Sequence, residues 1–596
     1  MTSLYPAKGG VLTRRRFVTG IGAWGALLTA PGRSSRAQSP MTGPTGQPAA
    51  TPSTRFDLGI ERLHANITGH RVRAVGINGT TPAPILRWRQ GDTVELNVTN
   101  HLHEESSIHW HGIRLPAPMD GVPGLSFAGI APGTTFTYRF RLHQSGTYWY
   151  HSHSGFQEQK GLYGAIIIDP KHGEPHPFDR EYVMLLSDWT DVDPADIVSN
   201  LKFDSDYYNF RQRTVGTLFH DMRRQGMGAA LHDRLQWGAM NMAPTDILDV
   251  SGIIYTYLLN GQSPQANWTG LFQPGERIRL RFINASSMTL FDVRIPGLEM
   301  TVIQADGNDV EPVGVDEFRI GTAETYDVLV TPQGPGPYTV FAQAEDRTGY
   351  ARGTLATQAG VSGPVPPMDP RPLRTMTDMG MGHMDMRAPT PSHPVGMGKM
   401  AGMDGMDMGH MAHMHMPPPH RHGSPAAHTH LRPGVEVQSV AMMPINRLAE
   451  PGDGLEHNGR RVLTYADLRA TVAGADPRSP SREITLHLTG NMERFIWGFD
   501  GRKFSEAEPI RLALGERVRF IVTNDTMMEH PVHLHGFWSE LENGQGDYRP
   551  YKHTIIVKPG ERLSYLVTVD EPGMWAYHCH LLYHMELGMF RTVIVS

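Results

Sequence analysis

The chain has 596 residues, a formal net charge of −6 from 54 basic and 60 acidic side chains, and a single cysteine. Its length allows about three or four domains of ~150 residues each, while the nearly balanced charge, with no basic run after the N-terminus, gives no electrostatic basis for nucleic-acid binding. The single cysteine excludes an intramolecular disulfide framework, so stability must come from hydrophobic cores and from any bound metal.

Residues 1–37 have the order of an export signal. The run Arg14-Arg15-Arg16 is followed by a glycine-interrupted apolar stretch and then by small and polar residues up to Ala37. This order is typical of a twin-arginine signal peptide; the alternative is a chance basic start before a short helix. The apolar stretch is too short to span a bilayer, and no other run of about 18 apolar residues occurs. We therefore predict a periplasmic protein, folded before export, that has no membrane span.

One sequence pattern occurs three times along the chain. Each copy has an Asn-Gly or Asp-Gly turn, a second turn of Gly-Asp or Gly-Glu, and alternating apolar residues that end in Asn. Alternation with a period of two indicates strands, so each copy is predicted to form a hairpin-like unit. The copies span residues 77–100, 259–284 and 499–524.

A second β pattern follows each copy and begins at Pro132, Gly321 and Pro559. Three repetitions of short alternating strands imply three β-sandwich domains, because such strands favour sandwiches over barrels or α/β folds. The predicted fold class is therefore all-β, with residues 201–235 as the main candidate for helix. The predicted domains span residues 55–170, 175–360 and 440–596.

Residues 361–433 break the β pattern. Methionine and histidine are dense there, above all in residues 376–416, with Gly, Pro and Asp between them and no usable period. We predict a disordered or loosely ordered insert. Thioethers are soft ligands that prefer Cu(I), so the insert is predicted to collect copper; the alternative is a solvated linker of unusual composition.

Four His-x-His pairs occupy matching positions in the first and third predicted domains. Side chains two residues apart lie on one face of a strand, so each pair directs both imidazoles the same way. If the two domains meet, their imidazoles suit a cluster of about three metal ions with open positions for an oxygen ligand. The pairs are His109/His111, His151/His153, His533/His535 and His578/His580.

The second predicted domain lacks these histidines. It has Val293 and Ile295 at the position of the first pair, and Phe341 and Gln343 at the position of the second. We therefore expect the middle domain to be a spacer without metal ligands.

The only cysteine, Cys579, lies between two of these histidines, and in a strand it points to the opposite face. One strand could therefore serve two metal sites. A trigonal Cys/His/His site with a weak axial Met is the arrangement of a blue-copper centre. Zinc is an alternative for any single cluster, but it does not explain the combination of Cys, His and Met. The candidate ligands of this second site are Cys579, His584, Met589 and, as the remaining histidine, His530.

These histidine segments resemble the four signatures of multicopper oxidases. They read HWHG at 109–112, HSH at 151–153, HPVHLHG at 530–536 and HCH at 578–580. The resemblance implies three cupredoxin-like Greek-key β-sandwich domains and four copper ions, one of type 1, one of type 2 and two of type 3. By position, it assigns His530, Cys579, His584 and Met589 to type 1 copper, His109 and His533 to type 2, and His111, His151, His153, His535, His578 and His580 to type 3.

Further stretches resemble the bacterial copper-resistance branch of that family, the copper resistance protein A family. They are MDGVPGLS at 119–126, GTYWYHSHSGFQ at 146–157, LSDWT at 186–190 and NGRRVLTYAD at 458–467. The twin-arginine start and the Met/His-rich insert agree with this branch.

The resemblance implies that a reducing substrate delivers single electrons to the type 1 copper, and that dioxygen is reduced to water at the other three ions. Oxygen reduction needs protons, which calls for a carboxylate near the cluster. Asp120 is the first candidate, with a plain Asp-Gly turn as the alternative, and Glu586 is the second. Some relatives carry an acid directly after the type 1 histidine, where this chain has Met585.

The Met/His-rich insert favours Cu(I), oxidised to Cu(II), as the substrate. Two alternatives remain open: a laccase-like oxidase of phenols, and a periplasmic copper-sequestering protein whose oxidase centre is inactive. Other periplasmic copper-handling proteins are candidate partners.

Overall fold

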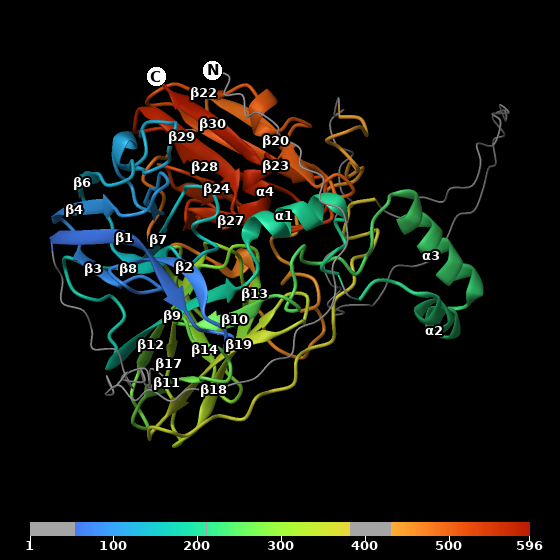
Figure 1. The fold of residues 1–596 in the computed structure, drawn as a ribbon, viewed down its shortest axis with the longest axis horizontal. Coiled ribbons are helices and arrows are strands. Elements are labelled where there is room, and N and C mark those ends of the chain that lie inside the picture. The colour runs from blue at the N-terminus through green and yellow to red at the C-terminus, as the bar shows by residue number, and fades with distance from the viewer. Residues whose placement is uncertain (1–53, 210, 382–430) are drawn as a thin grey trace, which may run out of the picture. The chain divides into compact units, whose positions relative to one another are not determined.

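The computed structural model describes residues 54–209, 211–381 and 431–596, and strands dominate there (Figure 1). They form six sheets, which fall into three pairs along the chain. The all-β prediction is confirmed. The predicted signal peptide and most of the Met/His-rich insert lie outside the described residues.

The first two sheets hold residues 55–169, with strand orders β2-β1-β4-β6 and β3-β8-β7-β5. The edge strand β5 carries His109 and His111 and pairs antiparallel with β7, so that His109 lies opposite His151. The strands are β1 (Arg55–Ala65), β2 (Val72–Ile77), β3 (Leu86–Arg89), β4 (Thr93–Asn100), β5 (His109–His111), β6 (Thr135–Arg141), β7 (Gly146–His151) and β8 (Tyr163–Asp169).

The next two sheets hold residues 180–356, with strand orders β10-β9-β12-β17-β14-β15 and β11-β19-β18-β13-β16. The strands are β9 (Arg180–Trp189), β10 (Thr256–Leu259), β11 (Trp268–Leu271), β12 (Ile278–Asn284), β13 (Phe291–Arg294), β14 (Met300–Ala305), β15 (Asn308–Val315), β16 (Glu317–Ile320), β17 (Thr325–Val330), β18 (Tyr338–Ala344) and β19 (Tyr350–Ala356).

The last two sheets hold residues 482–595, with strand orders β21-β20-β23-β28-β25-β26 and β22-β30-β29-β24-β27. In the second of them β24 and β29 pair antiparallel, which places His533 opposite His578. The strands are β20 (Arg482–Asn491), β21 (Ile496–Phe499), β22 (Ile510–Leu512), β23 (Arg517–Asn524), β24 (His530–Leu534), β25 (Ser539–Leu541), β26 (Tyr551–Lys552), β27 (Thr554–Val557), β28 (Arg562–Thr568), β29 (Gly573–Cys579) and β30 (Phe590–Val595).

The repeated sequence unit contains strands, but it is not a hairpin. In the first copy β2 and β4 lie in one sheet, whereas β3 lies in the other. The other two copies cross between their sheets in the same way. The prediction of a hairpin-like unit was wrong because alternation identifies a half-buried strand without identifying its partner.

The Asn that ends each unit is buried and holds the loop that follows. The Asn100 carboxamide donates to the carbonyls of Glu104 and Ile130 and accepts from the Leu102 amide. Asn284 and Asn524 make equivalent bonds. In the first and third copies this loop leads to β5 and β24, so the repeated Asn positions the histidine-bearing strands.

Helices occupy the region where one was predicted. They are α1 (Pro194–Phe203), α2 (Val215–Gln225) and α3 (Met227–Ala239); a short α4 (Leu582–Glu586) follows β29. α1 starts earlier than expected because Asp193 caps it, accepting from the Ala195 amide. Within the described ranges, no helix is long and apolar enough to cross a membrane.

Part of the stretch 361–381 is buried, although the sequence pattern assigned it to the insert. Arg374 and Met379 are both buried. This stretch has no period of its own because ion pairs, and not a sheet, hold it in place.

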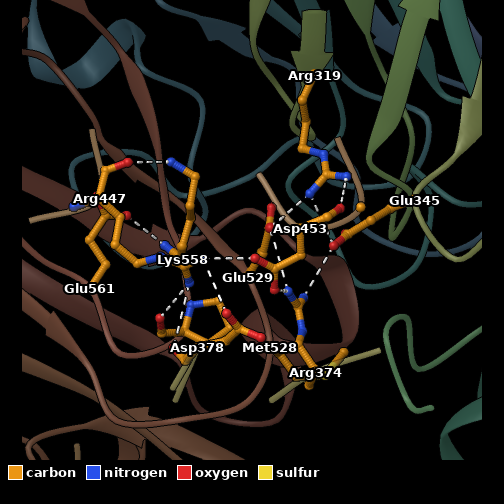
Figure 2. A network of polar contacts seen from close by, with 12 residues as sticks. Arg319, Glu345, Arg374, Asp378, Arg447, Asp453, Met528, Glu529, Lys558 and Glu561 are labelled. Atoms are coloured by element: carbon orange, nitrogen blue, oxygen red, sulfur yellow. Dashed lines mark hydrogen bonds and ion pairs between the residues drawn. The ribbon is translucent and has the colours of Figure 1, made fainter. Parts of the chain in front are cut away.

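A buried network of ion pairs connects this stretch to the second and third pairs of sheets (Figure 2). Arg319, on β16, lies 3.2 Å from Glu345 and 2.9 Å from Glu529, which immediately precedes β24. Arg374 pairs with Glu345 at 3.1 Å and with Asp453. Glu529, the residue before His530, is therefore held by Arg319 and, at 3.8 Å, by Arg374.

Candidate metal centres

The single cysteine lies beside two histidines at the first candidate centre. Cys579 Sγ is 3.4 Å from His530 Nδ1 and 3.9 Å from His584 Nδ1, and the two nitrogens are 3.2 Å apart. Met589 is fully buried, and its main chain bonds to both Cys579 and His584. Burial raises the pKa of the Cys579 thiol, so a thiolate here needs an adjacent cation. The donor set fits a type 1 copper.

Both imidazoles of this centre are oriented by further contacts. His530 Nε2 is 2.7 Å from Thr526 Oγ1. His584 Nε2 is 2.8 Å from Asp249 Oδ2, and its ring stacks on Trp497 with ring centroids 3.7 Å apart. The outer nitrogens are therefore occupied, which leaves Nδ1 of each ring for a metal.

The second candidate centre brings together all eight histidines of the four His-x-His pairs. The rings of His111 and His533 stack with centroids 3.8 Å apart, and those of His109 and His535 lie 4.0 Å apart. His578 Nε2 is 3.0 Å from the Nε2 of His535 and 3.4 Å from that of His153. The rings of His151 and His580 have centroids 5.0 Å apart. Strands of the first and third sheet pairs thus face each other across one site.

Several ring nitrogens at this centre are buried and have no hydrogen-bond partner. Unpaired buried donors and acceptors are costly, so such a group of nitrogens indicates an absent ligand. Imidazole nitrogens suit copper. The unpaired atoms are Nε2 of His109, His151 and His533, Nδ1 of His111, and both nitrogens of His580.

Asp120 touches two of the ligand candidates. Its Oδ2 is 2.9 Å from His535 Nδ1, and its backbone carbonyl is 2.8 Å from His109 Nδ1. The following Gly121 has φ +82°, and a Cβ there would lie 1.8 Å from the carbonyl oxygen of Ile108. Gly121 therefore allows the chain to turn here. The turn places the Asp120 carboxylate next to His109 of the first sandwich and His535 of the third.

Glu586 does not occupy a comparable position. It is exposed, at the last residue of α4. A second buried acid at the cluster, besides Asp120, is Glu158. Its Oε2 is 2.5 Å from His151 Nδ1, and its pKa is raised by burial and then by the charges of Asp188 and Glu586. Glu158 was not among the predicted residues; its only local signal is its position five residues after His153.

Two other residues at the centres were also missed. Asp249 comes from the segment between α3 and β10, and nothing in the local sequence relates it to His584. His553 is a ninth imidazole at the cluster; it is buried, and its Nδ1 is 3.1 Å from His111 Nε2. It belongs to no His-x-His pair, so counting pairs could not find it.

Removal of copper should make the protein sensitive to acid. Burial lowers the pKa of His578 from 6.5 to about 3 and that of His553 to about 4. These folded-state pKa values lie below the pKa of about 6.5 expected in the unfolded chain, so between them the unfolded state binds more protons. The stabilisation is complete above about pH 6.5 and is lost as the pH falls through the folded-state pKa values. Bound copper blocks protonation of its ligands. Urea unfolding between pH 7 and pH 4 should show a steeper loss of stability for copper-free than for copper-loaded protein; equal slopes would contradict this expectation.

The chain belongs to the multicopper oxidase family. Family models described as multicopper oxidase match residues 60–173, 180–360 and 477–596. The chain is 30% identical to Multicopper oxidase MmcO of Mycobacterium tuberculosis, over 95% of this chain and 90% of that protein. The protein is therefore a copper-dependent oxidase with type 1, type 2 and type 3 copper, and the resemblance read from its motifs is confirmed.

Higher similarity links the chain to one branch of the family. It is 54% identical to Copper resistance protein A of Escherichia coli, over 98% of this chain and 99% of that protein. The corresponding protein of Pseudomonas syringae is 53% identical, over 98% and 99%.

Solved structures agree on the fold. Fet3p, described as a multicopper oxidase that functions in iron import, superposes with a TM-score of 0.62 at 19% identity, covering 91% of this chain and 90% of its own. The laccase from Botrytis aclada gives 0.59 at 20% identity, with 91% and 88% covered. The predicted cupredoxin-like fold is confirmed.

Proposed function

We propose that this chain is a periplasmic copper-resistance oxidase that oxidises Cu(I) to Cu(II) and passes the electrons to dioxygen, which takes up protons and leaves as water. When bound, the resident coppers supply one-electron oxidation at one centre and oxygen reduction at the other. The proposed type 1 ligands are His530, Cys579, His584 and Met589; the proposed type 2 ligands are His109 and His533; and the proposed type 3 ligands are His111, His151, His153, His535, His578 and His580.

The observation that carries the proposal is the position of strand β29 between the two centres. Cys579 points to one side, towards His530 and His584, while His578 and His580 point to the other side. A few covalent bonds of backbone therefore join the two sets of ligands. Such a connection suits an enzyme that separates the uptake of electrons from their use.

Acidic side chains near the first centre favour a cationic substrate. Asp249 contacts His584, and Asp249 and Asp246 each have a buried Oδ1 without a partner. Burial, then the charges of Asp206 and Asp249, raise the pKa of Asp246. A cation bound beside these carboxyl groups would favour their ionised form, and a neutral phenol would not.

The flanks of the Met/His-rich insert attach to the segment that leads to Asp249. On the N-terminal flank, the Arg374 amide donates to the carbonyl of Pro244 at 3.0 Å. On the C-terminal flank, the Gln438 side chain donates to the carbonyls of Met240 and Asn241 at 2.7 and 3.2 Å. Both ends of the insert are thus anchored close in sequence to the carboxylate that touches His584, which supports delivery of copper to this centre.

Protons for oxygen reduction require a carboxyl group beside the cluster. Asp120 holds His535 and His109, and Glu158 holds His151. We propose Asp120 as the proton-handling residue and Glu158, rather than Glu586, as the second acid. The exposed position of Glu586 at the end of α4 offers no comparable contact.

Oxygen uptake by the purified copper-loaded protein tests the function. We expect a strong blue absorption band, and faster oxygen consumption with Cu(I) than with phenols. Uptake with phenols but not with Cu(I) would indicate the laccase-like alternative. No uptake with any donor would indicate a copper-sequestering protein.

Deletion of residues 382–430 should slow Cu(I) oxidation at low copper, because a tethered set of thioethers raises the local copper concentration. Residues 361–381 include the buried Arg374 and Met379 and should be kept. We expect a loss of about 10-fold or more at limiting Cu(I), which disappears at saturating Cu(I). A matched variant with the methionines of residues 384–416 changed to leucine keeps the length and should behave like the deletion. Unchanged rates in both variants would contradict a delivery role.

A further inference from the structure

The ninth imidazole, His553, lies where the three pairs of sheets meet. It sits between β26 and β27 and is 2% exposed. Its backbone amide and that of Thr554 both donate to Asp306 Oδ2 at 3.1 Å, and Asp306 follows β14 in the middle pair of sheets. The residue is therefore fixed from outside its own sandwich.

His553 contacts two ligand candidates in different ways. Its carbonyl oxygen is 2.6 Å from His533 Nδ1, and its ring Nδ1 is 3.1 Å from His111 Nε2. His533 belongs to the third pair of sheets and His111 to the first. One residue thus holds a histidine from each of the sandwiches that form the cluster.

His111 differs from neighbouring ligand candidates in its outer contact. The Nδ1 atoms of His109, His533 and His578 lie 2.6 to 2.9 Å from backbone carbonyl oxygens. The outer nitrogen of His111 instead faces His553 Nδ1 and the Thr554 hydroxyl, both at 3.1 Å.

The unpaired atoms show which nitrogen of His111 faces the metals. Its Nδ1 is buried without a partner, whereas for His109 and His533 the unpaired atom is Nε2. If His111 Nδ1 binds copper, its Nε2 carries the hydrogen and needs an acceptor. A neutral imidazole offers one acceptor nitrogen, and this is a better acceptor than a hydroxyl that can itself donate to His553.

The glycine after His111 makes room for this contact. Gly112 has φ +80°, and a Cβ there would lie 2.5 Å from Cδ2 of His553. The rings of His111 and His553 meet edge to face, with centroids 4.7 Å apart. The absence of a side chain at residue 112 therefore leaves space for the His553 ring beside His111.

We propose that His553 is a positioning residue of the trinuclear centre: it accepts a hydrogen bond from His111 Nε2 and so directs Nδ1 of His111 towards copper. This inference rests on the proposed function, in which His111 is a type 3 ligand. His553 contacts no substrate in this role.

The test compares His553→Leu, which removes the acceptor, with His553→Asn, whose Oδ1 replaces the ring Nδ1. We measure copper content per chain, the type 1 absorption band, and the electron paramagnetic resonance signals of type 2 and uncoupled type 3 copper. The leucine variant should retain the blue band and bind the trinuclear copper about 10–100-fold more weakly, with new signals from uncoupled type 3 copper. The asparagine variant should resemble the unmodified protein. His172→Ala, at an exposed histidine, is the control.

Two outcomes would overturn the inference. One is a leucine variant with the copper content and spectra of the unmodified protein. The other is loss of the cluster in Thr554→Val but not in His553→Leu, which would make the hydroxyl the acceptor. Should the leucine variant not fold, His553→Ala takes its place beside His553→Asn. Failure of the proposed function would differ from both, because the unmodified protein itself would then lack the blue band or the cluster signals.

Discussion

Replacing Cys579 with serine is expected to abolish both the blue absorption and oxygen consumption. Cys579 is the only thiol of the chain and lies 3.4 Å from His530 Nδ1 at a fully buried site. A hydroxyl is a harder and weaker ligand for copper than a thiolate. Because loss of an outer contact alone costs about 10–100-fold in affinity or activity, loss of the thiolate should cost more. Visible absorption, copper content and oxygen uptake with Cu(I) measure the effect.

The eight-histidine cluster should survive this change. His578 and His580 point away from Cys579, so the type 2 resonance signal should persist in Cys579→Ser. Met589→Leu is the matched comparison: an axial thioether is a weak ligand, and the blue band should remain. A blue Cys579→Ser protein, or loss of the type 2 signal together with the blue band, would contradict the division of β29 between two centres.

The variant Arg319→Met should destabilise the protein strongly. Arg319 is buried and pairs with Asp292 at 2.8 Å, Glu345 at 3.2 Å and Glu529 at 2.9 Å (Figure 2). Its removal leaves buried carboxylates without their shared cation. Breaking a buried ion pair in this way costs about 3–5 kcal/mol. Urea denaturation followed by tryptophan fluorescence measures the change.

An exposed pair provides the control for this prediction. Arg62 lies 2.6 Å from Glu104, and both side chains are about half exposed, at 49% and 48%. Solvent screens such a pair, so Arg62→Met should change stability little. If both variants unfold at the same urea concentration, the network of Figure 2 does not hold the sheets together. Because Glu529 precedes His530, we also expect Arg319→Met to alter the blue absorption.

Strand content and the grouping of the candidate ligands could be predicted from the sequence because both depend on spacing. Period-two alternation identifies strands, and a His-x-His pair places both rings on one face of a strand. The same rule separates Cys579 from His578 and His580. The repeated Asn100, Asn284 and Asn524 identified the three copies of the unit. Alternation could not show which strands pair, or which of the two sheets each strand joins.

The partial burial of residues 361–381 shows a different limit of prediction from sequence. These residues have no period, so composition alone assigned them to the insert. Their packing depends on Arg374, whose partners Glu345 and Asp453 are distant in sequence. An ion pair formed between separate sandwiches leaves no local pattern, because it exists only once the chain has folded.

The sequence by itself determined which side chains could bind copper, since ligand type and strand period are properties of short segments. Only the tertiary structure decided what surrounds those ligands. Asp249 reaches His584 from the segment between α3 and β10, Glu158 reaches His151, and His553 reaches His111 from the far end of the chain. The partners in these contacts have no fixed spacing in the sequence, because the contacts form only when the chain folds. The residues that orient the ligands could therefore be identified only from the tertiary structure.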